Sequence, residues 1–571
     1  MSSAPCLFLC LLGFVAYTNA ETLKMEPVVQ LKQGTLEGFR FRYPDESGRF
    51  ANIYLGVPYA KPPVDDLRFE RPQPLDESDS RIATKKFAPG CMAVSAPIKL
   101  PPNSNVTVGP PQSSEDCLYL NVMAPSEKSP FPTGYPVLLF IHGGGFSGGS
   151  SEMYGFQAIA HEFAGQAIVM VTIQYRLGLF GFFSNGDSTA PGNLGLWDQK
   201  QALEWIRDNI AAFGGNPKHV TLWGQNSGAA SVGALSISPK TRDLFHQSIE
   251  MSGSVMAGWA NSNRVVDESM QVAKKVGCAL KTPSLVKECM KAKPVEELTD
   301  AMQETGWRRD AINFARFQPR WDNDFFNKPV DELIRESPKK PTIQGITSQE
   351  AMLTTLPFSG APRQIKFIET EIARPEFFGA KTEEARQKLI QFYADRNATL
   401  AKTIDPHFYL TRYTQILSDT QFAIPSLMEV RKKSEEGWPV YLYLSNYMNP
   451  RIKLPVLGTY STYEFPYLFG LSVVGPFEFD PEDRKLQSLI VSSFANFVHS
   501  GNPSTMRAIW PAVTAEHPLG FFDMRPDPVL RDNLMLDRLQ FWEQMAHDFD
   551  YDLIRDVDKR TEQPKDFAQK L

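Results

Sequence analysis

Long runs of one charge are missing from this 571-residue sequence, and its 65 acidic residues slightly outnumber its 59 Lys and Arg residues. A surface that binds nucleic acid needs a basic stripe or patch, so this composition argues against a nucleic-acid partner. Internal repeats and low-complexity linkers are missing as well. Because 42% of the residues are hydrophobic, the composition excludes disorder and indicates a soluble globular protein with a sizeable core.

Beyond residue 20 no apolar stretch is long enough to cross a bilayer, so we expect no membrane span. Residues 6–17 form a shorter apolar run, which is followed by Thr18-Asn19-Ala20. Small residues at 18 and 20 suit cleavage by signal peptidase, although no Lys or Arg precedes the run. We therefore predict a signal peptide over residues 1–20, a single domain over residues 21–571, and a secreted protein or one that stays in the lumen of the secretory pathway.

Cysteine is scarce, with six residues in all, and two of them lie in the predicted signal peptide. An even number in a secreted protein favours disulfides over buried free thiols, and the four that remain allow three pairings. Sequential pairing would close two local loops. The triplets that begin at Asn105 and Asn397 are sequons for N-glycosylation. The four cysteines outside the predicted signal peptide are Cys91, Cys117, Cys278 and Cys289.

Short apolar runs alternate with helical patterns along the chain. A helix is predicted around 198–206, where apolar residues recur at helical spacing, and Asn216-Pro217 is expected to break the chain before a strand at 220–223. This alternation predicts an α/β fold with a mainly parallel sheet and helices on both faces, and in such sheets the site forms at the carboxyl ends of the strands. The runs with the length and composition of buried strands are 137–141, 167–173, 220–223, 341–346 and 440–444.

The loop after the strand predicted at 220–223 has the form of a nucleophile elbow. Its sequence, Gly224-Gln225-Asn226-Ser227-Gly228, follows a strand and precedes a helical pattern, as in the motif Gly-x-Ser-x-Gly. Hydrolases with that motif have a serine hydroxyl at the central position, where this chain has Asn226.

The sequence resembles the carboxylesterase type-B (cholinesterase-like) family over most of its length. The resemblance rests on several motifs in the family's order, which together are far more specific than any one of them. It implies the α/β-hydrolase fold, with a central mostly parallel sheet and helices on both faces. The motifs are Gly56-Val57-Pro58-Tyr59-Ala60-Lys61-Pro62-Pro63, Ser114-Glu115-Asp116-Cys117-Leu118-Tyr119-Leu120-Asn121, His142-Gly143-Gly144-Gly145-Phe146, Gln174-Tyr175-Arg176-Leu177-Gly178, Pro191-Gly192-Asn193-Leu194-Gly195-Leu196-Trp197-Asp198-Gln199 and Phe213-Gly214-Gly215-Asn216-Pro217.

The resemblance aligns Asn226 with the family's nucleophile and Gln225 with the acidic residue before it. Ester hydrolysis of this type needs a hydroxyl that a neighbouring base deprotonates, and the delocalised nitrogen of an amide is no substitute. Ser227 offers a hydroxyl one residue later, but a one-residue shift on a tight turn points its side chain elsewhere. We expect Asn226 to have a positive φ, which asparagine tolerates best after glycine, so that the fold is kept while the chemistry is lost.

The resemblance places Ser461 where the family has its histidine and Glu350 where it has its acid. A serine hydroxyl cannot act as the general base near neutral pH, whereas imidazole can. None of the eight histidines is close to Ser461 in sequence, and His142 stands at a family position that supports the glycine loop. Without an imidazole to orient, Glu350 is expected to bond to Ser461 or to a water molecule.

The family's oxyanion hole is kept in the sequence. Gly144, Gly145 and Ser227 match its three backbone N–H donors, which need no side chain. The segment between Cys91 and Cys117 contains no aromatic residue, so the resemblance does not extend to a cation–π site for choline. The sequence points to no metal and no cofactor.

These substitutions predict a secreted, catalytically inactive carboxylesterase-like protein that binds an extracellular protein or a small apolar or ester ligand. The alternative is a carboxylic ester hydrolase with displaced catalytic residues, which requires Ser227 and a distant histidine to meet. An error in the sequence would need separate mistakes at Asn226 and Ser461, with Gln225 changed as well. Members of the family often form homodimers through C-terminal helices, and the pattern around 539–549 offers such a helix, but the sequence leaves the oligomeric state open.

Overall fold

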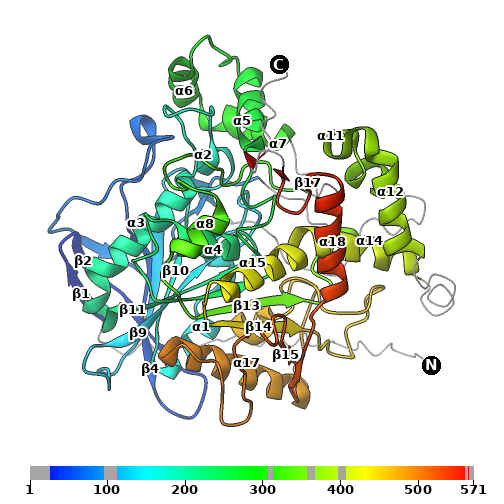
Figure 1. Ribbon diagram of the computed structural model, residues 1–571. Helices are drawn as coiled ribbons and strands as arrows, with labels where there is room; N and C mark the ends of the chain where they lie inside the picture. The colour runs from blue at the N-terminus through cyan, green and yellow to red at the C-terminus, as the bar shows by residue number, and fades with distance from the viewer. Residues whose placement is uncertain are drawn as a thin grey trace, which may run out of the picture.

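The computed structural model describes residues 26–94, 112–305, 313–356, 367–395, 407–559 and 563–564. The predicted signal peptide and both sequons, at Asn105 and Asn397, lie outside these residues. Within the part of the chain that is described, no helix has both the length and the apolar composition that a bilayer crossing requires. Figure 1 shows the arrangement of the helices and strands.

An eleven-stranded sheet runs through the middle of the molecule (Figure 1). Its central strands, from β10 across to β15, are all parallel, and antiparallel pairs occur at both edges. The predicted α/β fold with a mainly parallel sheet is therefore confirmed. In spatial order the strands are β16 (Val529–Arg531), β15 (Phe521–Met524), β14 (Val440–Ser445), β13 (Thr342–Thr347), β12 (Gln247–Met251), β11 (Gly215–Gln225), β9 (Tyr135–Ile141), β10 (Val169–Ile173), β8 (Tyr119–Pro125), β4 (Phe50–Pro58) and β3 (Phe39–Arg42).

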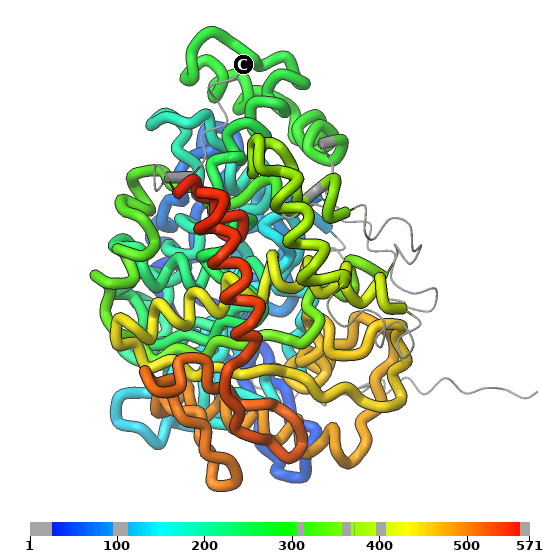
Figure 2. Tube along the Cα trace, turned by 45° about the vertical axis from the view of Figure 1, so that its right-hand side comes forward, coloured from blue at the N-terminus to red at the C-terminus, as the bar shows by residue number. Residues whose placement is uncertain are grey.

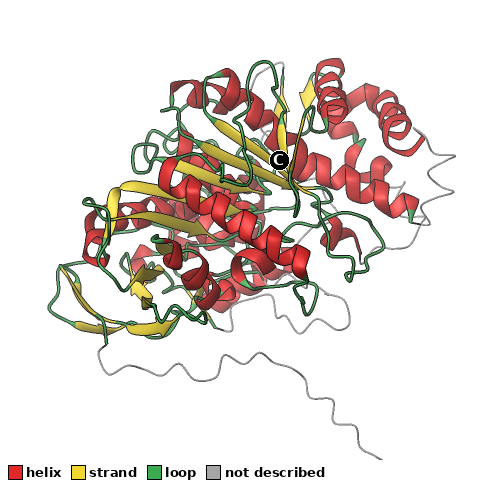
Figure 3. Cartoon of the chain, turned by 90° about the horizontal axis from the view of Figure 1, so that it is seen from below, coloured by secondary structure: helices red, strands yellow, loops and turns green. Residues whose placement is uncertain are grey.

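Alternate residues of the central strands face two hydrophobic cores, one on each side of the sheet. In β9, Val137, Leu139 and Ile141 join one core, whereas Leu138 and Phe140 join the other. Because side chains alternate along a strand, a strand that is covered on both faces is apolar throughout. Figure 3 shows the helices on both faces of the twisted sheet.

Different helices cover the two faces. One core contains residues of α3, α4, α15 and α18, and the other contains residues of α1, α16 and α17. The C-terminal helix α18, red in Figure 2, packs against α15. The bounds are α1 (Gln157–Glu162), α3 (Leu194–Asn209), α4 (Ser227–Ile237), α15 (Ile424–Glu435), α16 (Phe465–Phe469), α17 (Pro481–Ser500) and α18 (Leu536–Asp548).

One predicted boundary is wrong. Asn216-Pro217 does not break the chain, because β11 runs continuously from Gly215 to Gln225. The predicted interruption appears instead as an irregular register against β9 between Gly215 and Val220. A proline is tolerated in a strand where its missing N–H is not needed for the ladder, as at such an irregularity.

The four cysteines pair sequentially. Cys91 bonds to Cys117, and Cys278 bonds to Cys289. The second pair joins the loop after α5 (Arg264–Lys275) to α6 (Pro283–Lys291), in the group of helices at the top of Figure 1. Of the three pairings that the sequence allows, the structure therefore has the one that closes two local loops.

Candidate functional site

The turn between β11 and α4 holds Asn226 in a constrained conformation. β11 ends at Gln225 and α4 begins at Ser227, so that Asn226 alone connects the strand to the helix. A Cβ atom on Gly224 would lie 2.2 Å from the carbonyl oxygen of Gly228, and this close approach explains the flanking glycines. The backbone of Asn226 has φ 56° and ψ −121°, so the predicted positive φ is confirmed.

The physical reason that we gave for asparagine at this turn needs correction. Asparagine is favoured in the left-handed helical region, where ψ is about +30 to +60°, and the ψ of Asn226 lies far outside it. A non-glycine residue with such a backbone costs about 1–3 kcal/mol unless its surroundings hold it in place. Two backbone hydrogen bonds help to hold it: the nitrogen of Asn226 donates to the carbonyl oxygen of Met251 at 2.9 Å, and its carbonyl oxygen accepts from the nitrogen of Ala230 at 3.0 Å.

The side chain of Asn226 bonds to the glycine loop that follows β9. Its Oδ1 atom accepts hydrogen bonds from the backbone nitrogens of Gly145, at 2.9 Å, and Gly144, at 3.4 Å. Gly144 has φ 125°, and a Cβ atom on it would lie 2.2 Å from the carbonyl oxygen of Gly148, so the loop requires glycine there. The N–H groups of Gly144 and Gly145, two of the three predicted oxyanion donors, are therefore already bonded to the side chain of Asn226.

Ser227 begins α4 and is completely buried. In the part of the chain that the structure describes, no hydrogen bond joins its hydroxyl to an imidazole. The nearby glycine loop begins at His142, which is also buried, and burial lowers the pKa of His142 to about 4. The Nδ1 atom of His142 lies 2.9 Å from the carbonyl oxygen of Gly143, to which it can donate, and its ring stacks on Tyr175. These contacts hold the loop in place.

The structure brings Gln225, Ser461 and Glu350 together. The Nε2 atom of Gln225 donates to the hydroxyl of Ser461 at 3.1 Å, and the backbone nitrogen of Ser461 donates to the carbonyl oxygen of Glu350 at 3.3 Å. The Oε1 atom of Glu350 accepts a hydrogen bond from the backbone nitrogen of Thr347 at 2.7 Å. The three positions that were aligned from the sequence are therefore neighbours at the carboxyl ends of β11 and β13.

Two buried carboxyl groups share this region. Burial raises the pKa of Glu350 to about 7, although the hydroxyls of Ser252 and Ser461 and the backbone N–H of Thr347 offset part of the rise. Burial and the charge of Glu350 raise the pKa of Glu464 to about 8. The sequence does not single out Glu464, although it lies only three residues after Ser461 in the same short segment.

The hydroxyl of Tyr443 contacts the second of these carboxyl groups. Its oxygen lies 3.4 Å from Oε1 of Glu464, to which it donates. Tyr443 comes from β14, and a Cβ atom on Gly345 in the neighbouring strand β13 would lie 1.9 Å from its ring. A side chain at position 345 would therefore displace the tyrosine ring that contacts Glu464.

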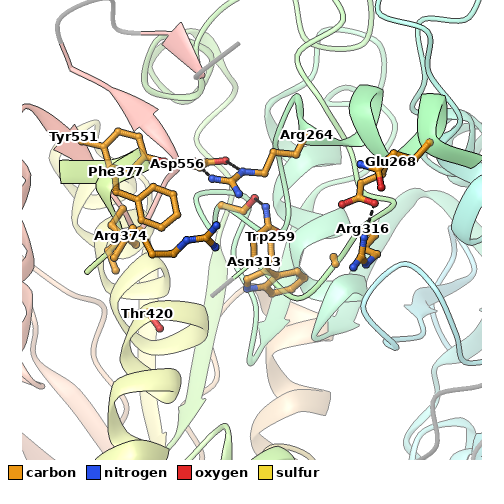
Figure 4. A pocket seen from close by; sticks show the side chains of 15 residues that line it. Trp259, Arg264, Glu268, Asn313, Arg316, Arg374, Phe377, Thr420, Tyr551 and Asp556 are labelled. Atoms are coloured by element: carbon orange, nitrogen blue, oxygen red, sulfur yellow. Dashed lines mark hydrogen bonds and ion pairs between the residues drawn. The ribbon is translucent and has the colours of Figure 1, made fainter. Parts of the chain in front are cut away.

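A cavity of about 310 Å³ lies between Arg264, Arg316 and Arg374 (Figure 4). Trp259 forms part of its wall and also contacts Phe146 of the glycine loop, with 6.1 Å between the ring centroids. Arg264 and Arg316 line the cavity and form ion pairs with Asp556 and Glu268, respectively. None of the positions predicted for the site lines this cavity, so it is separate from Asn226 and Ser461.

No cluster of three or more His, Cys, Asp or Glu residues suited to a metal ion occurs among the described residues.

Comparisons with known proteins agree on one family. The model of the carboxylesterase family matches residues 25–542. Gut esterase 1 of Caenorhabditis elegans is 33% identical over 552 residues, which cover 92% of this chain and 94% of the relative. Carboxylesterase 1D of Rattus norvegicus is 32% identical over 509 residues, which cover 84% of this chain and 86% of the relative. Acetylcholinesterase of Danio rerio is 30% identical over 559 residues, which cover 88% of this chain and 86% of the relative.

Proposed function

The chain belongs to the carboxylesterase family and has the α/β-hydrolase fold, and we propose that it is a member that does not hydrolyse esters and acts by binding. The observation that carries this proposal is the placement of Asn226 at the nucleophile elbow, with its Oδ1 atom bonded to Gly145. One side chain thereby replaces the nucleophile and also uses the backbone donors on which an oxyanion would depend.

The nucleophile is the first part of the chemistry that is missing. A carboxamide nitrogen cannot be deprotonated by a neighbouring base near neutral pH, so Asn226 cannot form an acyl-enzyme. Donors and binding alone give triad enzymes about 10³–10⁴-fold acceleration over water. Because Gly144 and Gly145 already donate to Asn226, even that residual acceleration should be reduced here.

The general base is the second missing part. Ser461 stands beside Glu350, where an imidazole would have to be oriented, and its hydroxyl instead accepts a hydrogen bond from Gln225. A serine hydroxyl does not accept a proton near neutral pH. Glu350 is thus proposed to be the retained acid of a triad whose other two positions are occupied by Asn226 and Ser461.

An ester hydrolase with displaced residues is the competing candidate. It would need the hydroxyl of Ser227 within reach of a histidine, because a serine nucleophile requires a base at hydrogen-bond distance. The buried Ser227 has no such bond among the described residues, and the low pKa of His142 disfavours its acting as a base at neutral pH. These two observations weigh against the displaced arrangement.

We propose that the protein is secreted and that its partner is an extracellular protein or a small apolar or ester ligand. Two disulfides suit an oxidising compartment. Helix α18 occupies the region that the sequence indicated for a homodimer interface, and we retain that interface as part of the proposal.

A fluorophosphonate probe tests the proposal, since it reacts covalently with activated serine nucleophiles. The purified protein should remain unlabelled, and an aryl-ester assay should give no rate above that of heat-denatured protein. An active carboxylesterase processed in parallel provides the positive control. Stoichiometric labelling of Ser227 would establish the displaced arrangement and reject the proposal.

A further inference from the structure

A larger cavity, of about 700 Å³, lies beside the loop that follows β12. Its walls come from that loop, from the segment that leads into α8 (Val330–Glu336) and from residues around β18 (Val557–Asp558). Its volume falls within the range of about 300–1,000 Å³ that is usual for small-molecule sites. It shares no lining residue with the cavity of Figure 4, and none of Asn226, Glu350 and Ser461 lines it. It is therefore a separate candidate site.

The side chain of Asn261 is buried in the wall of this cavity without a hydrogen-bond partner. Asn261 is 5% exposed, and neither its Oδ1 atom nor its Nδ2 atom has a partner among the described residues. Native proteins pair nearly all their buried polar groups, because a buried amide that bonds to nothing destabilises the fold. Both atoms of this amide are thus available to an occupant of the cavity.

Hydrogen bonds on both sides of Asn261 fix its position in the loop. The backbone nitrogen of Ala260 donates to the carbonyl oxygen of Ala257 at 2.8 Å, and that of Ser262 donates to the carbonyl oxygen of Pro319 at 3.0 Å. A shift of the loop that gave the amide a partner within the chain would break these bonds. The amide is therefore held in place before a ligand binds, which lowers the entropic cost of binding.

Much of the charge around the cavity is already neutralised. Three of its five cationic residues form ion pairs with carboxylates, so a charged ligand would have to compete with those pairs. The uncharged groups include four asparagines, Asn261, Asn263, Asn323 and Asn327, and the aromatic ring of Trp321. The ion pairs are Arg555 with Asp331 and with Asp552, Lys328 with Glu336, and Arg335 with Glu436.

We propose that this cavity binds an uncharged saccharide, with Asn261 bonded to two neighbouring hydroxyls of one sugar ring. An amide presents donors and an acceptor side by side, and each hydroxyl of the sugar both donates and accepts. A carboxylate only accepts and an ammonium only donates, so neither satisfies both atoms of Asn261. A trans peptide group has its N–H and C=O on opposite sides, so it also satisfies only one of them. Trp321 supplies an apolar face for the C–H groups of the ring.

This inference goes beyond the proposed function, because it concerns a cavity that the triad positions do not line. It holds whether or not the protein hydrolyses esters. A free sugar and the end of a glycan on an extracellular glycoprotein present the same hydroxyls, so the two sources are distinguished by experiment. The free glycoside that binds best is compared with serum albumin to which the same sugar has been coupled. Tighter binding of the coupled sugar would indicate a glycan, and tighter binding of the free glycoside would indicate a small saccharide.

Saturation-transfer difference NMR tests the proposal with the methyl glycosides of glucose, galactose, mannose and N-acetylglucosamine. The method suits weak ligands, and single sugar rings bind weakly because their hydroxyls replace hydrogen bonds to water. In titrations, at least one glycoside should bind tenfold more tightly than cyclohexanol, which has one hydroxyl, and than the anion glucuronate. Adenosine is the competing probe, since the edge of its base also pairs with an amide. Preference for adenosine or glucuronate over every glycoside, or no binding by any probe, would overturn the proposal.

Asn261→Leu distinguishes a ligand contact from a structural one. Leucine has a similar size and no polar atoms, so this variant should bind the glycoside at least tenfold more weakly and melt at the same or a higher temperature. Asn209 is the matched control, because it is 7% exposed but its Nδ2 atom donates to the carbonyl oxygen of Trp205 at 3.0 Å. Asn209→Leu should melt at a lower temperature and keep its affinity. Unchanged affinity of Asn261→Leu, or a lower melting temperature, would contradict the proposal.

The aromatic ring provides a further measurement, which stays informative if Asn261→Leu does not fold. Trp321→Ala removes the apolar face and should weaken glycoside binding about tenfold. Trp321→Phe keeps a ring at this position and should stay within about threefold of the wild type. Affinities of both variants equal to that of the wild type would show that the sugar does not bind in this cavity and would reject the proposal.

Discussion

The side-chain oxygen of Asn226 lies 2.9 Å from the backbone nitrogen of Gly145 and accepts its hydrogen bond. The bond joins the turn after β11 to the loop after β9, two segments that meet at the carboxyl edge of the sheet. It stabilises a backbone conformation that asparagine rarely adopts. The same bond engages the N–H of Gly145, which ester hydrolysis would use as an oxyanion donor. Asparagine at position 226 therefore both removes the nucleophile and occupies this donor.

Replacement of Asn226 should separate the backbone contribution from that of the side chain. Asn226→Ala keeps the unfavourable φ and loses the hydrogen bonds, so its free energy of unfolding should fall by about 1 kcal/mol. Asn226→Gly loses the same bonds but relieves the backbone, and it should be about 1–3 kcal/mol more stable than the alanine variant. Urea denaturation measures both. Equal stability of the two variants would show that the turn is not strained.

Glu350→Gln should change how stability depends on pH. The pKa of Glu350 is about 7 in the folded chain and about 4.5 in the unfolded chain, so between these values the folded chain binds more protons. Its contribution to stability is therefore present below about pH 4.5 and is lost as the pH rises through about 7, by about 3 kcal/mol. Urea denaturation at pH 5, 6.5 and 8 should show the stability difference between variant and wild type shifting by that amount.

Asp208→Asn serves as the control for this experiment, because Asp208 forms an exposed ion pair with Arg207. Its stability should follow that of the wild type at all three pH values. Glu464 is retained in the Glu350→Gln variant, so part of the decrease in its free energy of unfolding with rising pH should remain. A variant whose slope equals that of the wild type would mean that Glu350 titrates as an ordinary carboxyl.

His142 should destabilise the protein on acidification. Burial lowers its pKa from 6.5 to about 4, so between these values the unfolded chain binds a proton that the folded chain does not. The free energy of unfolding should fall by about 3 kcal/mol from this cause as the pH drops from 6.5 to 4. An NMR titration of the His142 ring measures the pKa directly. A midpoint near 6.5 would be incompatible with its burial in the glycine loop.

Much of the sheet could be predicted from the sequence because its central strands are apolar on both faces. The runs at 137–141 and 440–444 coincide with β9 and β14 to within two residues at each end. The prediction at Asn216-Pro217 was wrong because a proline, which has no N–H, breaks a strand only where the ladder requires a donor at that position. Sequence patterns do not record that need, since it depends on the register of the neighbouring strand.

The sequence predicted positions for the candidate site and one contact between them, that of Glu350 with Ser461, but not the contacts of Asn226. Aligned motifs identified Asn226, Glu350 and Ser461, and the structure brings the last two together. No local pattern could show that the amide of Asn226 turns toward Gly145, because that contact spans about eighty residues of sequence. Glu464 was missed for a similar reason, since only its burial beside Glu350 distinguishes it from an ordinary acidic residue.

The most direct test of the account combines Asn226→Ser with Ser461→His and compares this double variant with the wild type and both single variants. Because the nucleophile and base act as a unit, each single variant should stay within about tenfold of the wild-type aryl-esterase rate. The double variant should rise at least about 100-fold above it and should be labelled by fluorophosphonate at position 226. Hydrolysis and labelling by the wild type, or a double variant that folds but remains as inactive as the wild type, would contradict the claim that these two substitutions silenced an otherwise intact site.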